Sequence, residues 1–279
     1  MLGHDVVGAL LAAGRKVSAL SRAYLDITDP ARVAEVVAAL AGPGGVVVNC
    51  AAFTGVDAAE TAEPAAFTLN ATAPALLAAA CAQVGARMVQ ISTDYVFDGT
   101  ADTPYDEAEV PRPAGAYGRT KAAGEWAVRA GLPQASWVVR TSWLYGAQGT
   151  NFVRTMLGLA ATRDTVSVVA DQTGAPTWTG EVAAAVLRLV EADAPPGTYH
   201  ATASGSTTWH GLARRAFSLA GLDPSRVHAT TTDAFPRPAP RPAYGVLGHD
   251  RWGAAGLPEP ADWDAVLTRV MPELLTSWG

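Results

Sequence analysis

Three consecutive stretches decide the fold: VVVN at residues 46–49, the alanine-rich ATAPALLAAACAQV at residues 71–84, and RMVQIS at residues 87–92. Short β-branched runs separated by a longer helical stretch are typical of parallel strands joined by a helix. The same pattern predicts further strands at residues 16–20, 136–140 and 166–169. Because such crossovers are right-handed, we expect an α/β fold with a doubly wound parallel sheet covered on both faces.

Local signals mark where the predicted helices begin and end. Asp29-Pro30 places a capping side chain before a proline at the first helical position. Gly14 and Gly85 stand where helices should end, since glycine adopts the left-handed cap without strain.

The texture of the sequence changes after about Asp171, where Gly, Pro, Thr and Trp become frequent and a helix is predicted over Thr207 to Ala220. We expect a first domain at residues 1–170 and a smaller, mainly substrate-binding lobe at residues 171–279, interleaved with the first. The proline-rich stretch from Phe235 to Pro242 is predicted to be a loop, because proline removes backbone donors and disfavours helix before it.

Composition narrows the class of protein. The chain has 279 residues, of which 49% are hydrophobic and 16% charged, and its formal net charge is -6. This charge disfavours an overall attraction to nucleic acid or anionic membranes. Two cysteines, Cys50 and Cys81, cannot form a secreted disulfide framework. No uncharged apolar run approaches the roughly 18 residues of a membrane span. We therefore expect a cytoplasmic enzyme or binding protein.

The start of the chain departs from a dinucleotide-binding, Rossmann-like fold. Such a fold begins with a strand and a glycine-rich turn before its first helix, whose N-terminal amides meet the pyrophosphate. Here Met1 runs directly into the helix that ends at Gly14, and only Gly3 could belong to that turn. The expectation is that the natural gene product begins upstream, or that this form binds cofactor poorly.

The strongest chemical pattern is Tyr117-Gly118-Arg119-Thr120-Lys121, preceded by Ser92-Thr93-Asp94-Tyr95 at the end of a predicted strand. Residues four apart on a helix share a face, so Tyr117 and Lys121 point into the same space. An ammonium group near a phenol lowers the phenol's pKa, and we therefore expect Tyr117 to be a proton donor near neutrality. Thr93 would hold a substrate oxygen beside it. Such a pair alone also occurs by chance on helix surfaces.

The surrounding motifs are more specific. The pair of Tyr117 and Lys121 resembles the active site of extended short-chain dehydrogenases/reductases. The longer stretches of sequence around it resemble the dTDP-4-dehydrorhamnose reductases within that superfamily. The matching stretches run from Ser92 to Gly99, Tyr117 to Lys121, Arg140 to Gly146, Asn151 to Val153, Asp171 to Thr177 and Ala203 to Trp209. They span nearly the whole chain in the expected order.

This resemblance implies reduction of the 4-keto group of a dTDP-linked 6-deoxyhexose by NADPH or NADH, yielding dTDP-L-rhamnose in the best-known case. It implies that Tyr117 is the general acid, that Lys121 lowers its pKa and binds the nicotinamide ribose, and that Thr93 hydrogen-bonds the carbonyl. The cofactor would supply the hydride, and the protein would position it.

Several residues are candidates for the cofactor. Ala51, Ala52 and Thr54 resemble the family's cofactor-flanking loop, although Ala-Ala is also ordinary packing. Asn70 either belongs to the same cluster or caps the next helix. Arg22 either favours the 2′-phosphate of NADPH or is a solvated surface arginine. The resemblance suggests that Asp26 and Ile27 contact adenine. Our expectation is NADPH, with NADH as the alternative.

The substrate side has its own candidates: Thr93, Asp94, Tyr95, Trp143, Asn151 and Arg241. Trp143 would give an apolar wall for a deoxysugar and Asn151 a polar anchor. Arg241, and with it Arg237, would clamp the diphosphate or stay solvated in the proline-rich loop. Trp126 and Trp137 are predicted to be core residues.

Other interpretations remain open at this stage. An epimerase or dehydratase of the same superfamily would use Asp94 as an acid, and a non-catalytic regulatory homologue need not keep Tyr117 or Lys121. The five histidines lack metal-ligand spacing, and no carboxylate cluster demands the Mg²⁺ that some relatives use. The expected partner is a dTDP-sugar, and a homodimer is possible.

Overall fold

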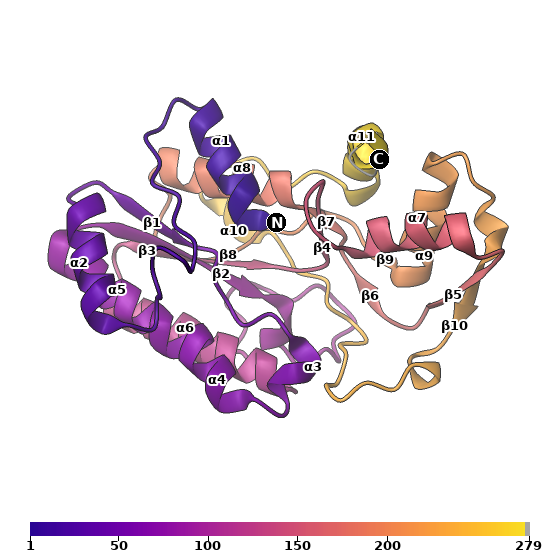
Figure 1. Cartoon of the computed structure of the whole chain (residues 1–279), viewed down its shortest axis with the longest axis horizontal. Helices are drawn as coiled ribbons and strands as arrows, with labels where there is room; N and C mark the ends of the chain where they lie inside the picture. The colour runs from indigo at the N-terminus through magenta and orange to yellow at the C-terminus, as the bar shows by residue number, and fades with distance from the viewer. Residues whose placement is uncertain (277–279) are drawn as a thin grey trace.

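A four-stranded parallel sheet forms the centre of the larger lobe in the computed structural model, which describes residues 1–276 (Figure 1). Its strand order is β1 (Val46–Asn49), β2 (Arg87–Thr93), β3 (Ser136–Thr141) and β8 (Gly197–His200). β2 and β3 pair over six residues, from Met88 opposite Ser136 to Thr93 opposite Thr141. The carboxyl ends of these strands meet at one edge, where parallel α/β sheets place their ligands.

Helices cover both faces of this sheet (Figure 1). One face carries α1 (Leu2–Ala12), α8 (Thr179–Glu191) and α10 (Asp250–Ala254), which pack around the buried Trp137 and Trp252. The other face carries α2 (Pro30–Leu40), α5 (Ala73–Val84) and α6 (Ala116–Gly131), packed around Met88 and Leu77. The expected two-sided α/β sheet is therefore confirmed.

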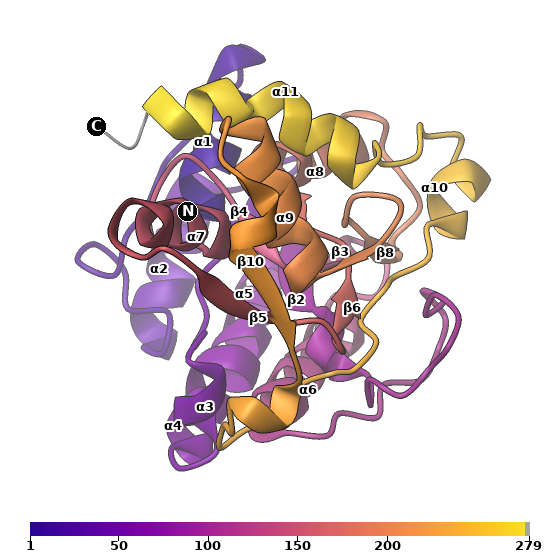
Figure 2. The ribbon, with the colours of Figure 1, turned by 90° about the vertical axis from the view of Figure 1, so that its right-hand side faces the viewer.

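The smaller lobe is built around a separate parallel pair, β5 (Val166–Val169) and β10 (Val227–Thr230). The helices α7 (Phe152–Thr162) and α9 (Trp209–Leu219) pack against it, and α11 (Trp263–Thr276) packs on α9. Figure 2 shows α11 lying across α9 at one end of this lobe. Two further pairs connect the lobes, β4 (Leu144–Tyr145) with β7 (Thr177–Trp178) and β6 (Thr173–Gly174) with β9 (Thr207–Thr208).

Short helical turns complete the chain. α3 (Val56–Ala59) and α4 (Glu63–Phe67) lead into η1 (Thr68–Thr72), a π-helical turn that joins α4 to α5. The 3-10 turns are η2 (Asp94–Val96), η3 (Pro224–Arg226) and η4 (Thr232–Ala234).

The predicted helix boundaries agree with the structure. The Asp29 side chain accepts hydrogen bonds from the backbone N–H groups of Ala31 and Arg32, so it caps α2 before Pro30. Gly85 ends α5 with a φ of 70°, the left-handed conformation that glycine adopts most readily. The helix predicted from Thr207 to Ala220 is α9.

Two expectations about the fold are wrong. Residues 16–20 form no strand, because within residues 1–276 no neighbouring strand pairs with them. Trp137 is buried as expected, whereas the Trp126 side chain is 54% exposed on α6. The strand expected at Val166–Val169 is present and pairs with β10 in the smaller lobe, and the division into two interleaved domains near residue 170 stays a prediction.

The helical run Glu63–Val84, made of α4, η1 and α5, contradicts the expectation that no apolar segment is long enough to span a membrane. It has 22 residues and is apolar enough to cross a membrane by length and composition alone. Half of its most apolar window is buried inside the protein. Because a core helix passes the same test, this run is weak evidence for a membrane segment.

Candidate active site

Thr93 and Tyr117 lie together at the carboxyl end of β2. Thr93 is the last residue of that strand, and Tyr117 is in the first turn of α6, which packs against β2 and η2. The Thr93 hydroxyl lies beside the Tyr117 phenol and acts to lower its pKa. The Tyr95 ring meets the Tyr117 ring edge to face, with centroids 5.6 Å apart. The structure thus brings the predicted threonine and tyrosine into direct contact.

Gly118 allows this close approach of α6 to the turn after β2. A Cβ on Gly118 would lie 2.0 Å from the carbonyl oxygen of Tyr95, closer than any side chain tolerates. The residue between Tyr117 and Arg119 must therefore be glycine if the phenol is to reach Thr93.

Lys121 is buried one turn after Tyr117, and its Nζ donates a hydrogen bond to the carbonyl oxygen of Ile91 at 2.6 Å. Burial lowers the pKa of Lys121 to about 8, although the Glu125 carboxylate opposes this shift. The pKa of Tyr117 is raised to about 12, first by burial and then by the Asp94 carboxylate. Desolvation of the phenol therefore dominates the pKa of Tyr117 in this structure, and a lowering of that pKa by Lys121 stays a prediction.

A buried network of charged and polar side chains joins β2, β3 and α6 next to the site. Arg140 on β3 and Glu125 on α6 form an ion pair at 2.7 Å, and both side chains are 1% exposed. The Ser92 hydroxyl also donates to Glu125, and His200 lies 3.3 Å from the Arg140 guanidinium. Burial, with Arg140 beside it, lowers the pKa of His200 well below its usual value. Sequence reasoning missed Glu125, although it lies one helical turn after Lys121.

The loop after β1 is held in place by Asn70, in the π-helical turn η1. The Asn70 side chain accepts from the backbone N–H of Phe53 at 2.8 Å and donates to the Phe53 carbonyl and to Thr120 Oγ1. It caps no helix. Ala51 and Thr54 are exposed in this loop, and Ala52 is half-buried. Asn70 therefore links the predicted cofactor loop to α6, the helix of Tyr117.

The other predicted cofactor residues lie in α1, on the opposite face of the sheet from α6, or in the coil before α2. Gly3 is in the first turn of α1, where a Cβ would lie 3.5 Å from the Cys50 Cβ at the end of β1. Arg22 and Asp26 are exposed in the coil before α2, and Ile27 is half-buried. Asp26 accepts hydrogen bonds from the backbone N–H and the hydroxyl of Thr28, which lower its pKa.

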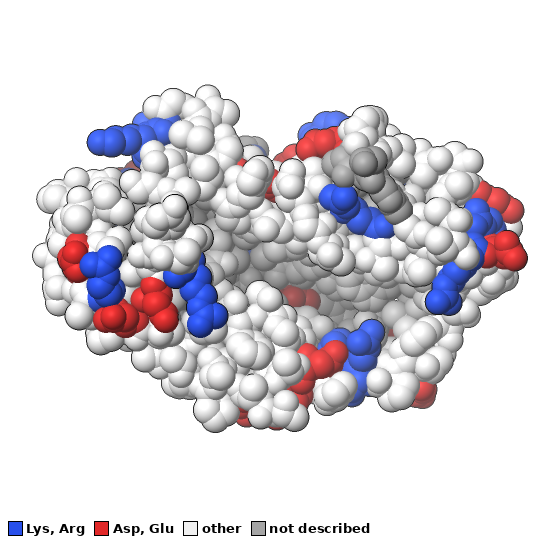
Figure 3. Space-filling model, viewed as in Figure 1, with Lys and Arg blue, Asp and Glu red and all other residues white. Residues whose placement is uncertain are grey.

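Arg241 reaches the same region from the proline-rich segment at residues 235–242. Its guanidinium donates to both carboxylate oxygens of Asp57 on α3 at 2.8 Å, and Arg237 lies 3.6 Å from the same carboxylate. Tyr95 and Arg241 line one small pocket with Gly115. The space-filling view shows a hollow between the two lobes, walled mainly by uncharged residues (Figure 3). Sequence reasoning missed Asp57 as the partner of Arg241.

Trp143 is held in a strained conformation between β3 and β4. Its φ is 47°, which is unusual for a bulky residue. Its ring stacks on Trp209 with centroids 3.5 Å apart, and a Cβ on Gly174 would lie 2.4 Å from the same ring. Strain of this kind tends to occur at functional sites.

The Asn151 side chain, in contrast, makes its hydrogen bonds within the protein. Its Oδ1 accepts from the backbone N–H of Arg154 and its Nδ2 donates to the carbonyl of Gly146. Both ends of the amide are therefore used within the protein, as the cap of α7.

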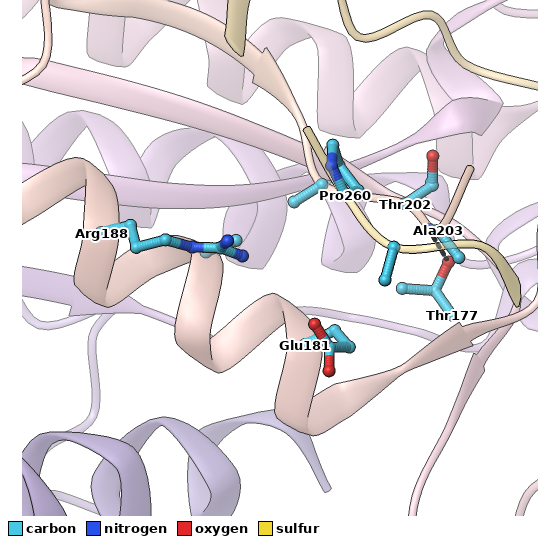
Figure 4. Close-up of a pocket in the computed structure, with 9 residues that line it drawn as sticks. Thr177, Glu181, Arg188, Thr202, Ala203 and Pro260 are labelled. Atoms are coloured by element: carbon cyan, nitrogen blue, oxygen red, sulfur yellow. Dashed lines mark hydrogen bonds between the residues drawn. The ribbon is translucent and has the colours of Figure 1, made fainter. Parts of the chain in front are cut away.

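A second pocket lies away from these residues, against α8 on the opposite face of the sheet from α6 (Figure 4). Glu181 and Arg188 point toward it from α8, and Thr177 accepts a hydrogen bond from the backbone N–H of Ala203. Glu181 is paired with Arg269. Within residues 1–276, no group of three or more His, Cys, Asp or Glu side chains could hold a metal ion.

Comparison with known proteins agrees with this geometry. The model of the RmlD substrate binding domain matches residues 1–276. A probable dTDP-4,6-dihydroxy-2-methyloxan-3-one 4-ketoreductase from Streptomyces antibioticus is 49% identical, over 99% of this chain and 93% of that protein. A dTDP-4-dehydrorhamnose reductase from Streptomyces griseus is also 49% identical, over 98% and 91%.

A solved structure is similar over the same length. The dTDP-4-dehydrorhamnose reductase of Bacillus anthracis, in complex with NADP, superposes with a TM-score of 0.92 at 36% identity. The match covers 98% of this chain and 95% of that one.

Proposed function

The chain belongs to the RmlD family of dTDP-4-dehydrorhamnose reductases, and we propose that it reduces the 4-keto group of dTDP-4-dehydro-L-rhamnose to give dTDP-L-rhamnose. The observation that carries this proposal is the contact between Tyr117 and Thr93 at the strand end, with Lys121 buried one turn further along α6. A proton donor and a second hydroxyl beside one another suit the reduction of a ketone. A regulatory homologue would have no need to bury such a constellation.

NADPH is the proposed cofactor, as in the Bacillus anthracis relative, whose structure holds NADP. The residues present fit a dinucleotide: the small residues Ala51 and Ala52 leave the backbone after β1 open, and the first turn of α1 lies beside Cys50. We propose that Gly3, Ala51, Ala52, Thr54 and Lys121 hold the nicotinamide half and the pyrophosphate. Arg22, Asp26 and Ile27 would hold the adenosine end, with Arg22 favouring the 2′-phosphate.

The protonation state of Tyr117 determines its proposed role in the reduction. The bound reduced nicotinamide supplies a hydride for C4 of the sugar. Tyr117, with a pKa of about 12, is protonated near neutrality and gives its proton to the ketone oxygen. Thr93 hydrogen-bonds the same oxygen, and Lys121, whose Nζ is held at the Ile91 carbonyl, would bind the nicotinamide ribose. One hydride and one proton are added, which balances the conversion of ketone to alcohol.

The substrate would lie in the hollow between the lobes. We propose that Trp143 gives an apolar wall for the deoxysugar, that Asp94 and Tyr95 border the hexose, and that Arg241 contacts the diphosphate. Asn151 is not included, because its amide is already occupied by Gly146 and Arg154.

The Streptomyces antibioticus relative favours a second candidate, since a 4-ketoreductase of another dTDP-sugar is equally similar. The test is consumption of NADPH by the purified chain with dTDP-4-dehydro-L-rhamnose or with dTDP-4,6-dihydroxy-2-methyloxan-3-one, with NMR identification of the product. We expect a higher kcat/KM for the first substrate. A higher value for the second would establish the alternative, and no turnover of either would refute the proposed function.

A further inference from the structure

Asp94 is a buried carboxyl group without a cation. Its side chain is 4% exposed, and its Oδ1 accepts a hydrogen bond from Thr93 Oγ1 at 2.9 Å. Its Oδ2 lies against the backbone of Gly245, where a Cβ would be only 2.8 Å away. No ion pair to Asp94 forms within the described part of the chain, residues 1–276. A buried carboxylate that lacks a cation is costly, so these surroundings favour the neutral acid.

The titratable groups around Asp94 do not change this conclusion. Tyr95 on the same turn and Tyr117 on α6 are neutral near pH 7, because burial and, after it, the nearby Asp94 raise the pKa of both phenols. Lys121 on α6 donates to the Ile91 carbonyl, and Arg241 from the proline-rich segment is paired with Asp57. Burial raises the pKa of Asp94 to about 7, and it outweighs the opposing hydrogen bonds from the Thr93 hydroxyl and from the backbone N–H groups of Asp94 and Tyr95.

The Thr93 hydroxyl has a single proton, and the direction of that proton depends on whether Asp94 is ionised or neutral. With Asp94 ionised, Thr93 donates this proton to the carboxylate, as the 2.9 Å contact allows. With Asp94 neutral, the acid donates to Thr93 Oγ1, and the Thr93 proton is free to turn toward the phenol oxygen of Tyr117 or the ketone. A donor aimed at the oxygen that gains negative charge stabilises the transition state.

We propose that Asp94 is a positioning residue that acts as a neutral acid: it donates to Thr93 and thereby directs the Thr93 hydroxyl proton toward the reacting oxygens. This inference rests on the proposed function, since it assigns a task within that reaction. It adds to the proposed place of Asp94 beside the hexose, and in this role Asp94 acts on the reaction only through Thr93.

The test uses Asp94→Asn and Asp94→Ala, with Asp102→Asn as a matched control. An asparagine amide donates to Thr93 permanently and imitates the neutral acid, whereas alanine cannot donate. Asp102 is exposed in a nearby loop, so its replacement makes the same chemical change away from the site. Turnover of NADPH and keto sugar is followed between about pH 5 and pH 9, and unfolding curves establish that each variant folds.

We expect wild-type kcat to fall as pH rises through the titration of Asp94. Asp94→Asn should keep kcat within about threefold of the wild-type maximum and lose the fall near pH 7, so that only a fall near the Lys121 pKa of about 8 remains, while Asp94→Ala should lose about tenfold or more at every pH. Asp102→Asn should match the wild type. If Asp94→Asn is as impaired as Asp94→Ala, or if neither variant changes the shape of the pH profile, the proposal is overturned.

A second measurement separates this proposal from the proposed function. The carboxyl carbons of ¹³C-labelled aspartate are titrated by NMR, and the signal missing from Asp94→Asn identifies Asp94. A midpoint near neutrality supports the proposal, whereas a midpoint at the ordinary aspartate value of about 4 overturns it, whether or not the enzyme turns over. A neutral Asp94 in a protein without reductase activity would instead refute the proposed function.

Discussion

Arg241 donates from one guanidinium nitrogen to both carboxylate oxygens of Asp57, at 2.8 Å each, across a separation of 184 residues. This ion pair holds the proline-rich segment at residues 235–242 against α3 of the larger lobe. It also holds Arg241 beside Tyr95, in the wall of the same small pocket. The Arg241 guanidinium is therefore held close to Tyr95, one of the residues proposed to border the sugar.

Replacing Arg241 should weaken binding of the nucleotide sugar. A charged hydrogen bond contributes about 1.5–3 kcal/mol, so Arg241→Ala should raise KM for the dTDP-sugar about tenfold or more, with a smaller effect on kcat. Arg237→Ala is the control. Arg237 is 59% exposed, and its distance of 3.6 Å from the Asp57 carboxylate is longer than that of Arg241. An unchanged KM in Arg241→Ala would remove Arg241 from the proposed diphosphate site.

Adding a methyl group at Gly174 should displace the wall of the sugar pocket. The new Cβ would lie 2.4 Å from the Trp143 ring, which is already fixed on its other side by Trp209. We expect Gly174→Ala to raise KM for the sugar several-fold while the affinity for NADPH, measured by fluorescence titration, stays unchanged. Gly253→Ala is the matched control, since nothing lies within 4 Å of its added Cβ. Identical steady-state constants in both variants would argue against a sugar contact for Trp143.

The buried pair of Glu125 and Arg140 should be far more important for stability than a surface pair. Glu125→Gln leaves the Arg140 guanidinium buried beside a neutral amide, and we expect a loss of about 3–5 kcal/mol in the free energy of unfolding. The double variant Glu125→Leu with Arg140→Met should lose less than this single variant. Arg119→Ala, which breaks an exposed pair with Glu63, should cost about 0–1 kcal/mol. Urea unfolding measures all three, and equal losses for Glu125→Gln and Arg119→Ala would contradict the assignment.

Asp94 should also make stability depend on pH. Because its folded pKa of about 7 is raised above the ordinary aspartate value, the stabilisation is complete in acid and is lost as pH rises through about 7. The free energy of unfolding of Asp94→Asn relative to wild type should therefore increase by about 2–4 kcal/mol between about pH 4 and pH 8. A difference that stays constant over this range would mean that Asp94 is ionised throughout.

Local sequence patterns predicted the centre of the fold well. The β-branched runs at residues 46–49, 87–92 and 136–140 are three adjacent strands, because each is buried between two helical layers. Residues 16–20 have a similar pattern but no neighbouring strand, and pattern alone carries no information about neighbours. Val166–Val169 illustrates the same limit, since it is a strand in a different sheet.

The candidate site was predictable only where its residues are close in sequence. Thr93, Tyr117 and Lys121 could be placed together from strand-end and helix-face reasoning, and Glu125 could have been added by the same spacing. The pairing of Asp57 with Arg241 has no local signal, because it depends on how the lobes fold together. The high pKa of Tyr117 was not predicted, because helix spacing reveals proximity to Lys121 but not the burial of the phenol.

The most direct test of the central claim follows a labelled hydride. NADPH carrying deuterium at both C4 positions of the nicotinamide is incubated with dTDP-4-dehydro-L-rhamnose and either the wild-type chain or Tyr117→Phe, with the exposed Tyr24→Phe as control. Wild type and Tyr24→Phe should give a product with deuterium on C4 of the hexose, and Tyr117→Phe should form it at least about 100-fold more slowly while still binding NADPH. Full activity in Tyr117→Phe, or a wild-type product without deuterium at C4, would contradict the account.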